Sequence, residues 1–434
     1  MKNKSTRIGS SAAWIAVLML LSLVLAACAP GAVAPAPSAP AAEGEGGAAA
    51  AGEPVELSWL SHTYEPWNNA LQAQADQYMA ENPGVSIVYS QVPHSDLNTK
   101  IATSIAAGEP PTIMGVYGPW MPQLLAGGAL APAPDWVLED LDANFPPVMK
   151  ESATYDGKVY GYVQHIGIHL PIINTAMYEA AGVEPPNTYE ELAAVNAKLD
   201  APDGSVFGID LATSKDGSWN VLHWSAILKA YGGQILNDDG TAAAFNTPEG
   251  LEVTNVYRSL THAELGAHDS AFIAEQTAMM WNGPWQKSNL EQSNPDLKYK
   301  AIQPIEGPAG RVAPAYVWFW VVSAAATPEQ QEQAWRFLQW ISAAEQYEAI
   351  YRNVGLIPIT NEIPEELKDD EWVQAFNEGL QYANIYYSKN AVWEQIDVAI
   401  GEELERLVVD EITAEEFLNN AEQRVNEILQ SAAS

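Results

Sequence analysis

The chain has 434 residues and carries 55 acidic against 20 basic residues, giving a formal net charge of −35 at pH 7. This charge argues against nucleic acid and against a bare anionic membrane as partners, because an acidic surface is repelled by both. A hydrophobic content of 47%, with 15 Trp and 18 Tyr, indicates a folded body, and its length exceeds what one hydrophobic core serves. We therefore expect two lobes.

The first 27 residues predict export from the cytoplasm. Three basic residues precede an apolar run at 12–27, which is shorter than a typical transmembrane helix. The run ends in Leu-Ala-Ala-Cys at 25–28, which resembles the lipobox of bacterial lipoproteins, where cleavage precedes a cysteine that receives lipid. Cys28 is the only cysteine, so an internal disulfide is excluded and lipidation is its expected role. An ordinary secretory peptide with a chance cysteine is the alternative.

Residues 29–53 are nearly all Ala, Pro, Gly and Glu and contain no aromatic residue. Such a segment cannot bury enough apolar surface to order itself. It is expected to be a disordered tether between Cys28 and a globular body that begins at about residue 54.

The body opens with strands and helices in alternation. Apolar and polar residues alternate over 55–60, and further strands are predicted at 85–89 and 113–116. A helix is predicted in each interval; the first ends before Pro83, and the second has Ser95 as its N-cap. Strands and helices at this spacing imply βαβ units and a largely parallel sheet.

Later helices carry clear start signals. Thr188, Thr327 and Thr413 are each followed three residues later by Glu or Gln, which fits the capping box. The helix after Thr327 and a long helix near 392–407 carry apolar residues at spacings of three and four. These stripes are predicted to be core faces.

Several short stretches point to one family. They lie at residues 105–113, 156–161, 172–174, 181–183, 186–192, 232–233, 278–285 and 334–338. Their order and spacing resemble the maltose-binding-like extracellular solute-binding proteins of ABC transporters. Thr112, Ala315-Tyr316 and Pro171-Ile172-Ile173 depart from the family pattern near the expected cleft, so the ligand stays open.

The resemblance implies an α/β fold of the two-lobed periplasmic-binding-protein type (type II-like). Each lobe would be a mostly parallel sheet flanked by helices, and a hinge of crossing segments would let the lobes close on a ligand. On this match, residues 54–162 plus 302–324 form lobe one, and 163–301 plus 325–434 form lobe two. The implied function is to capture a mono- or oligosaccharide and deliver it to an ABC permease. The protein would be an extracytoplasmic monomer, lipid-anchored to the cell membrane, without enzyme activity, metal or cofactor.

Ligands of α/β sheets lie at the carboxyl ends of strands. This rule and the family pattern select candidates that are mostly aromatic, because the C–H face of a sugar ring lies well against an indole or phenol. The candidates are Tyr64, Glu65, Tyr117, Trp120, Gln164, His165, Trp219, Trp285, Tyr316, Trp318 and Trp393. Each could instead be structural. Trp285 follows Gly283-Pro284, which resembles the family's stacking position.

Other ligands stay open for the same fold. A polyamine would suit Glu65 and the aromatic residues, whereas a phosphorylated polyol or a peptide would call for Arg, and only Arg311 lies near the predicted cleft. His165 and His169 have the spacing of a metal pair on a helix, but 156–173 is predicted to be strand and loop, which argues against a metal site. No nucleophile elbow or His-Glu-x-x-His motif is present, so a secreted hydrolase or an adhesin is a remote alternative.

Overall fold

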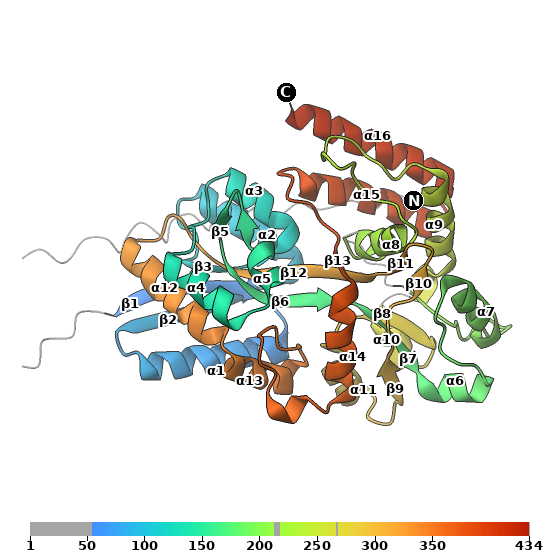
Figure 1. Ribbon diagram of the computed structural model, residues 1–434, viewed down its shortest axis with the longest axis horizontal. Coiled ribbons are helices and arrows are strands. Elements are labelled where there is room, and N and C mark those ends of the chain that lie inside the picture. Colours follow the sequence, from blue (N-terminus) through green and yellow to red (C-terminus); the bar gives the residue numbers. More distant parts are fainter. Residues whose placement is uncertain (1–53, 212–217, 266–267, 434) are drawn as a thin grey trace, which may run out of the picture. The chain divides into compact units, whose positions relative to one another are not determined.

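The structure is a computed structural model that describes residues 54–211, 218–265 and 268–433 (Figure 1). The predicted signal peptide, Cys28 and the predicted tether lie outside the described residues. Among the helices of the described ranges, none is both long and apolar enough to cross a membrane.

The larger sheet has the strand order β13-β12-β3-β1-β2, with β6 paired to β12 as well. Its strands are β1 (Val55–His62), β2 (Val85–Val92), β3 (Ile113–Tyr117), β6 (Tyr162–Ile168), β12 (Ala313–Val322) and β13 (Ala383–Ile385). Helices α1 (Glu65–Glu81) and α2 (His94–Ala106) connect β1, β2 and β3, which pair in parallel as predicted. β12 runs antiparallel to β3 and β6, so the sheet as a whole is mixed.

The smaller sheet places β7 (Leu170–Asn174) between β8 (Met279–Asn282) and β9 (Tyr299–Ala301). Both pairings are antiparallel, so the prediction of a mostly parallel sheet in each lobe is wrong here. The reason is the direction of the chain. β7 starts next to the end of β6 and runs away from it, whereas β8 and β9 both run toward the end of β6. The helices of this part of the chain are α6 (Thr175–Ala181), α7 (Tyr189–Leu199), α8 (Ser218–Ala230), α9 (Pro248–Ser259), α10 (His268–Ile273) and α11 (Gln286–Ser293). α6 packs on β7 and β9, and α10 packs on β8, whereas α8 packs on β12.

Two adjacent strands, β6 and β12, link the two sheets (Figure 1). All ten residues of β12 are buried; its second half pairs with β3 and its first three residues pair with β13. β6 is separated from β7 only by His169, whose backbone N–H donates to the carbonyl of Pro314, 2.9 Å away. These strands are therefore crossing segments of the kind expected at a hinge.

Helices α12 (Pro328–Ile341) and α13 (Ala344–Val354) pack with the elements of the larger sheet. α12 lies against β1, where the ring centroids of Phe337 and Trp59 are 5.1 Å apart. α13 lies against α1, and the Tyr347 hydroxyl donates to the carbonyl of Val163 on β6. The boundary expected at residue 325 assigns both helices to lobe two, whereas they pack with β1 and α1, which belong to the expected lobe one. The apolar stripe of α12 covers β1 instead.

The remaining elements are short, except for the C-terminal helices. α3 (Met121–Ala126), α4 (Asp135–Asn144) and α5 (Pro147–Ser152) follow β3, and two hairpins are formed by β4 (Thr154–Tyr155) with β5 (Lys158–Val159) and by β10 (Glu306–Gly307) with β11 (Gly310–Arg311). α14 (Glu371–Gly379) packs on β9, whereas α15 (Trp393–Val408) and α16 (Ala414–Ala432) pack with α8 and α9.

The predicted helix starts are largely correct. The hydroxyls of Thr188, Thr327 and Thr413 each accept a hydrogen bond from the backbone N–H three residues later. The reciprocal half of the capping box forms at Thr327 and Thr413, but Glu191 instead accepts from the N–H of Asn187, one residue before Thr188. The prediction that Ser95 caps α2 is wrong, because the helix begins at His94, directly after Pro93.

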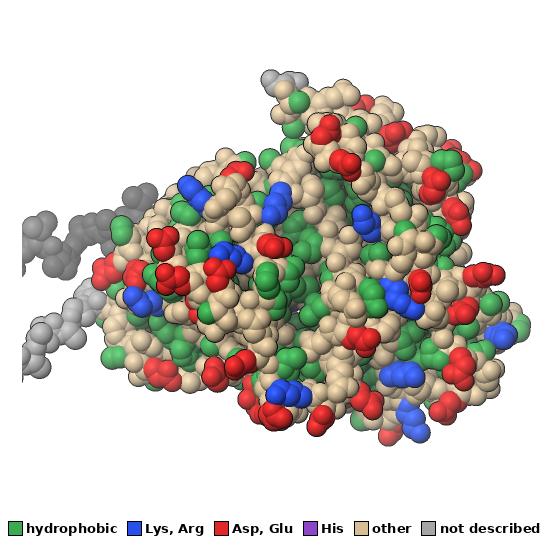
Figure 2. Space-filling model, in the orientation of Figure 1, with side chains coloured by type: hydrophobic (Ala, Val, Ile, Leu, Met, Phe, Trp, Pro, Cys, Tyr) green, Lys and Arg blue, Asp and Glu red, His purple; other side chains and the backbone are tan. Residues whose placement is uncertain are grey.

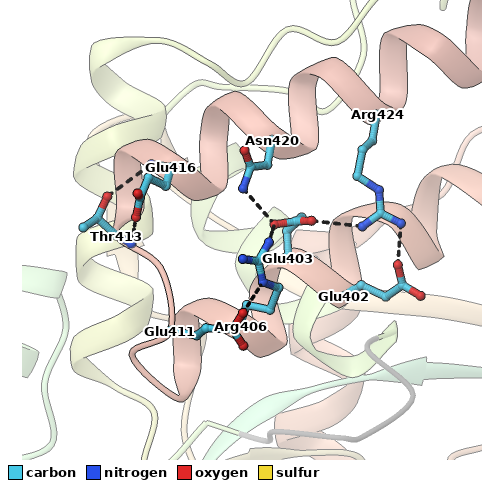
Figure 3. A network of polar contacts seen from close by, with 8 residues as sticks. All are labelled: Glu402, Glu403, Arg406, Glu411, Thr413, Glu416, Asn420 and Arg424. Atoms are coloured by element: carbon cyan, nitrogen blue, oxygen red, sulfur yellow. Dashed lines mark hydrogen bonds and ion pairs between the residues drawn. The ribbon is translucent and has the colours of Figure 1, made fainter.

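A buried carboxylate joins α15 to α16 (Figure 3). The side chain of Glu403 is 7% exposed and accepts hydrogen bonds from Arg406 (2.8 Å), Arg424 (3.1 Å) and Asn420 (3.1 Å). Each Arg also binds a more exposed carboxylate: Arg406 pairs with Glu411, and Arg424 with Glu402. The charge of Glu403 is therefore compensated where it is buried.

Acidic side chains are spread over the face seen in Figure 2, above both sheets and their helices. They are interspersed with fewer basic side chains and do not gather in one patch. The negative charge on this face is therefore distributed over its surface and does not mark one binding site.

Candidate ligand-binding site

A cavity of about 260 Å³ lies beside the crossing strands β6 and β12. Its lining contains seven of the predicted site residues: Tyr64, Tyr117, His165, Trp219, Trp285, Tyr316 and Trp318. The other residues that line it are His62, Thr63, Trp67, His94, Val354 and Leu356. We call this space the aromatic cavity.

The aromatic cavity is built from the crossing strands β6 and β12, the end of β3 and the starts of three helices. β12 contributes Tyr316 and Trp318, β6 contributes His165, and Tyr117 is the last residue of β3. Three further rings stand at helix starts. Tyr64 is the N-cap of α1, Trp219 lies in the first turn of α8, and Trp285 is the N-cap of α11.

The rings of the cavity contact one another as two neighbouring groups. Trp318 stacks on His165 with 6.3 Å between ring centroids and an interplanar angle of 20°. Trp219 meets Trp285 edge to face at 6.3 Å, and Tyr316 lies 6.4 Å from Trp285. Tyr117 joins the two groups, because its ring lies 5.3 Å from Tyr316 and 5.4 Å from Trp318. Mutual packing of this kind fixes the faces that a ligand meets.

Two glycines allow these rings to lie close against the backbone. A Cβ at Gly167, the pairing partner of Tyr316, would lie 2.2 Å from Cζ of that ring. A Cβ at Gly283 would lie 2.0 Å from Cζ3 of the Trp285 indole. Any other residue at either position would displace an aromatic wall of the cavity.

The lining of the aromatic cavity is poor in charged side chains. No Asp, Glu, Lys or Arg is found among the described residues that line it. Burial, aided by the neighbouring His94, lowers the pKa of His62 to about 3, and burial, aided by His62, lowers that of His165 to about 3. Both imidazoles are therefore uncharged at neutral pH and present hydrogen-bonding nitrogens without a net charge.

Four candidates lie outside the lining of the aromatic cavity. Trp120 is buried behind it, with its ring 5.6 Å from Tyr117 and 5.8 Å from Trp318. Gln164 is 1% exposed on β6, and its side-chain nitrogen and oxygen have no partner among the described residues. Glu65 is exposed in an adjoining recess, and Trp393 is buried on α15 beside Tyr386.

Sequence reasoning missed Trp67 and His94 as lining residues. Trp67 lies on the core-facing stripe of α1, so its helical spacing indicated packing alone. His94 follows β2, and the strand-end rule applied to that strand would have selected it. Val354 and Leu356 come from the end of α13 and carry no sequence signal.

A buried pair of histidines adjoins the cavity at the crossover between β6 and β7. His169 Nδ1 and His223 Nε2 are 2.8 Å apart, and the His169 ring lies 4.7 Å from Trp219 and 5.5 Å from Trp285. His165 lies on β6, outside any helix, and stacks on Trp318. In the part of the chain that the structure describes, no three His, Cys, Asp or Glu side chains are grouped to hold a metal ion.

Comparisons with known proteins agree with this architecture. A family model described as bacterial extracellular solute-binding protein matches residues 73–377, and the chain belongs to that family. The maltotriose-binding protein of Pyrococcus abyssi is 26% identical over 370 residues, which cover 82% of this chain and 78% of the relative.

Solved structures show the same two-lobed periplasmic-binding-protein fold. An ABC substrate-binding protein from Listeria monocytogenes, in complex with cycloalternan, superposes with a TM-score of 0.77 at 22% identity. It covers 87% of this chain and 100% of its own. An ABC transporter solute-binding protein from Thermotoga lettingae, bound with alpha-D-tagatose, superposes with a TM-score of 0.75 at 22% identity, covering 86% and 100% of the two chains.

Proposed function

We propose that the chain binds a neutral carbohydrate, a mono- or oligosaccharide, in the aromatic cavity and delivers it to an ABC permease. The observation that carries this proposal is a cavity walled by aromatic rings without a charged side chain among its described lining residues. The apolar faces of sugar rings stack on such walls, and the neutral imidazoles and tyrosine hydroxyls accept or donate hydrogen bonds to sugar hydroxyls.

The charged alternatives fit the cavity less well. A polyamine carries several ammonium groups and calls for carboxylates, yet Glu65 lies in the adjoining recess. A phosphorylated polyol or a peptide carboxylate calls for Arg. Arg311 pairs with Glu306 at 3.1 Å and donates to the carbonyl of Pro304, so its guanidinium is already engaged away from the cavity lining.

The relatives support the same substrate class. The similar protein from Pyrococcus abyssi is named for maltotriose, and the two solved neighbours hold cycloalternan and tagatose. All three ligands are uncharged carbohydrates. Membership of the extracellular solute-binding family, together with two neighbours described as ABC transporter components, supports a role in delivery to a permease without catalysis. We propose that the protein acts as a monomer.

Thermal unfolding with a ligand panel tests the proposal. The panel contains D-glucose, maltose, maltotriose, D-mannose, mannobiose, D-tagatose and ribitol, with spermidine and glucose 6-phosphate as charged counterparts. A ligand at 100 times its dissociation constant stabilises the folded protein by about 2.7 kcal/mol. We expect at least one neutral carbohydrate to do so. Stabilisation by spermidine or glucose 6-phosphate alone would overturn the proposal.

We further propose that Cys28 anchors the mature protein to the outer side of the cell membrane through lipid. The lipobox-like Leu-Ala-Ala-Cys at 25–28 and the absence of any other cysteine support this role. Mass spectrometry of protein isolated from its native host tests it. An unmodified thiol at residue 28, or a mature N-terminus elsewhere, would exclude the anchor.

A further inference from the structure

A second cavity, of about 460 Å³, adjoins the aromatic cavity. The two share Tyr64, which lines both. The second cavity lies between the start of α1, with Glu65 and Asn69, and the middle and end of α11, with Asn289 and Gln292. We call it the outer recess, and its lining is mainly polar, in contrast to the aromatic cavity.

The two cavities follow one another along the same helix. Trp285, the N-cap of α11, lines the aromatic cavity, and Asn289 and Gln292 line the outer recess. These residues are spaced by four and seven positions, which places them on one face of the helix. α11 therefore presents an indole to the inner space and amides to the outer one.

Helix α1 forms the opposing wall and, like α11, contributes residues to both cavities. Its N-cap Tyr64 lines both cavities, and Glu65 and Asn69, one turn apart, line the outer recess. Asn69 and Gln292 are exposed, as is Glu65. Within the described residues, no hydrogen bond or ion pair engages these three side chains. Carboxylate and amide groups are thus available to a ligand from both helices.

We infer that the ligand is an oligosaccharide of at least two rings, with one ring in the aromatic cavity and the next in the outer recess; this inference rests on the proposed function. The aromatic cavity alone, at about 260 Å³, lies below the range of roughly 300–1,000 Å³ usual for ligand pockets. A monosaccharide would fill it and leave Glu65, Asn69 and Gln292 in water. A second ring brings hydroxyls that the amides and the carboxylate hydrogen-bond, and bonds to an ionised carboxylate are the stronger kind.

Calorimetric titration with a saccharide length series tests the inference. The protein is titrated with D-glucose, maltose and maltotriose, and with D-mannose, mannobiose and mannotriose. Within the series that binds, the disaccharide should bind at least about 10-fold more tightly than the monosaccharide, since even two or three added hydrogen bonds account for that ratio. If the monosaccharide binds as tightly as the disaccharide, the inference is overturned and the proposed function stands. If no carbohydrate binds, the proposed function itself fails and the inference fails with it.

The double variant Asn69→Ala/Gln292→Ala locates the effect in the outer recess. Its affinity for the disaccharide should fall by about 10-fold, whereas its affinity for the monosaccharide should stay within about 2-fold of the unmodified protein. Gln72→Ala, an exposed change on α1 outside the recess, is the matched control and should alter neither affinity. An equal loss for both sugars, or no loss for the disaccharide, would overturn the inference. Both substitutions are on the surface, so an unchanged melting temperature is expected to accompany either outcome.

Discussion

The indole of Trp318 on β12 stacks on the imidazole of His165 on β6, and these residues are direct partners in the antiparallel pairing of the two crossing strands. His165 is 7% exposed. Burial, aided by the neighbouring His62, lowers the pKa of His165 to about 3 and so holds it in its neutral form. The cavity wall at the crossing strands is thus formed by a titratable group that is prevented from becoming charged.

This arrangement predicts a stability that falls in mild acid. The unfolded His165 binds a proton near pH 6.5, whereas the folded residue does so only near pH 3. Between these values the unfolded state binds more protons, so His165 raises the free energy of unfolding by up to about 1.4 kcal/mol per pH unit, and this contribution is lost as pH falls. His62, whose pKa is also about 3 when folded, adds a contribution of the same sign. Urea unfolding between about pH 5 and pH 7, above most carboxylate titration, measures this slope. His165→Asn should reduce it, and equal slopes in both proteins would contradict the prediction.

Trp285→Ala should weaken ligand binding with little loss of stability. Trp285 is only partly buried at the cavity, and aromatic anchors of this kind contribute about 1–3 kcal/mol, or roughly 5- to 150-fold in affinity. Trp281→Ala, four residues earlier on β8, is the matched control because Trp281 is 2% exposed in the core. It should cost about 3–5 kcal/mol of stability. Calorimetric titration and thermal unfolding of both variants separate the two roles. A collapse of stability in Trp285→Ala with unchanged affinity would place Trp285 in the core.

Gly283→Ala should lower affinity without removing any ligand-contacting group. The added Cβ would overlap the indole of Trp285, so the ring must rotate away from its place in the cavity wall. A loss of about 10-fold is expected, comparable to misplacing one aromatic contact. Gly84→Ala is the control, since its Cβ would meet no atom within 4 Å. Tryptophan fluorescence should change in Gly283→Ala only, and unchanged affinity together with unchanged fluorescence would refute this account.

The carboxylate of Glu403 should stabilise the C-terminal helices without affecting the ligand. Glu403→Ala leaves Arg406, Arg424 and Asn420 without their shared acceptor, at a cost of about 1–3 kcal/mol in the free energy of unfolding. Glu402→Ala removes an exposed carboxylate from the same cluster and should cost less than about 1 kcal/mol. Chemical unfolding measures both. Equal effects of the two substitutions would show that burial of Glu403 contributes nothing.

Ligand should make the protein more compact. Because β6 and β12 connect the two sheets beside the cavity, rotation about them would bring the walls together on a bound sugar. Small-angle scattering should therefore report a smaller radius of gyration at saturation with the sugar that binds. Trp285→Ala at the same sugar concentration serves as a control with low occupancy. An unchanged radius in the saturated protein would argue against closure.

The sequence predicted the early part of the fold well because its signals there are local. The alternation over β1 and the apolar stripe of α1 can each be recognised within a few residues. Tyr117, selected because it lies at the end of β3, lines the aromatic cavity. The antiparallel sheet around β7 depends on where distant segments return, which no local pattern encodes.

The same distinction applies to single residues of the site. Trp120 and Trp318 have similar sequence surroundings. Trp120 comes shortly after a strand, Trp318 lies within one, and both have aromatic neighbours. Trp318 faces the cavity and Trp120 lies behind it, because the two sides of that cluster are set by packing between β3, β12 and α2. Similarly, only the three-dimensional arrangement brings Val354 at the end of α13 to the cavity.

The continuous burial of β12 constrains how ligand preference can change in descendants or engineered forms of this protein. Tyr316 and Trp318 belong to a strand that pairs with β3, β6 and β13, so substitutions there disturb three neighbours as well as the ligand. Tyr64, Trp219 and Trp285 stand at helix starts and are only partly buried. New specificities should therefore arise by substitution at these helix starts, while β12 keeps its aromatic residues.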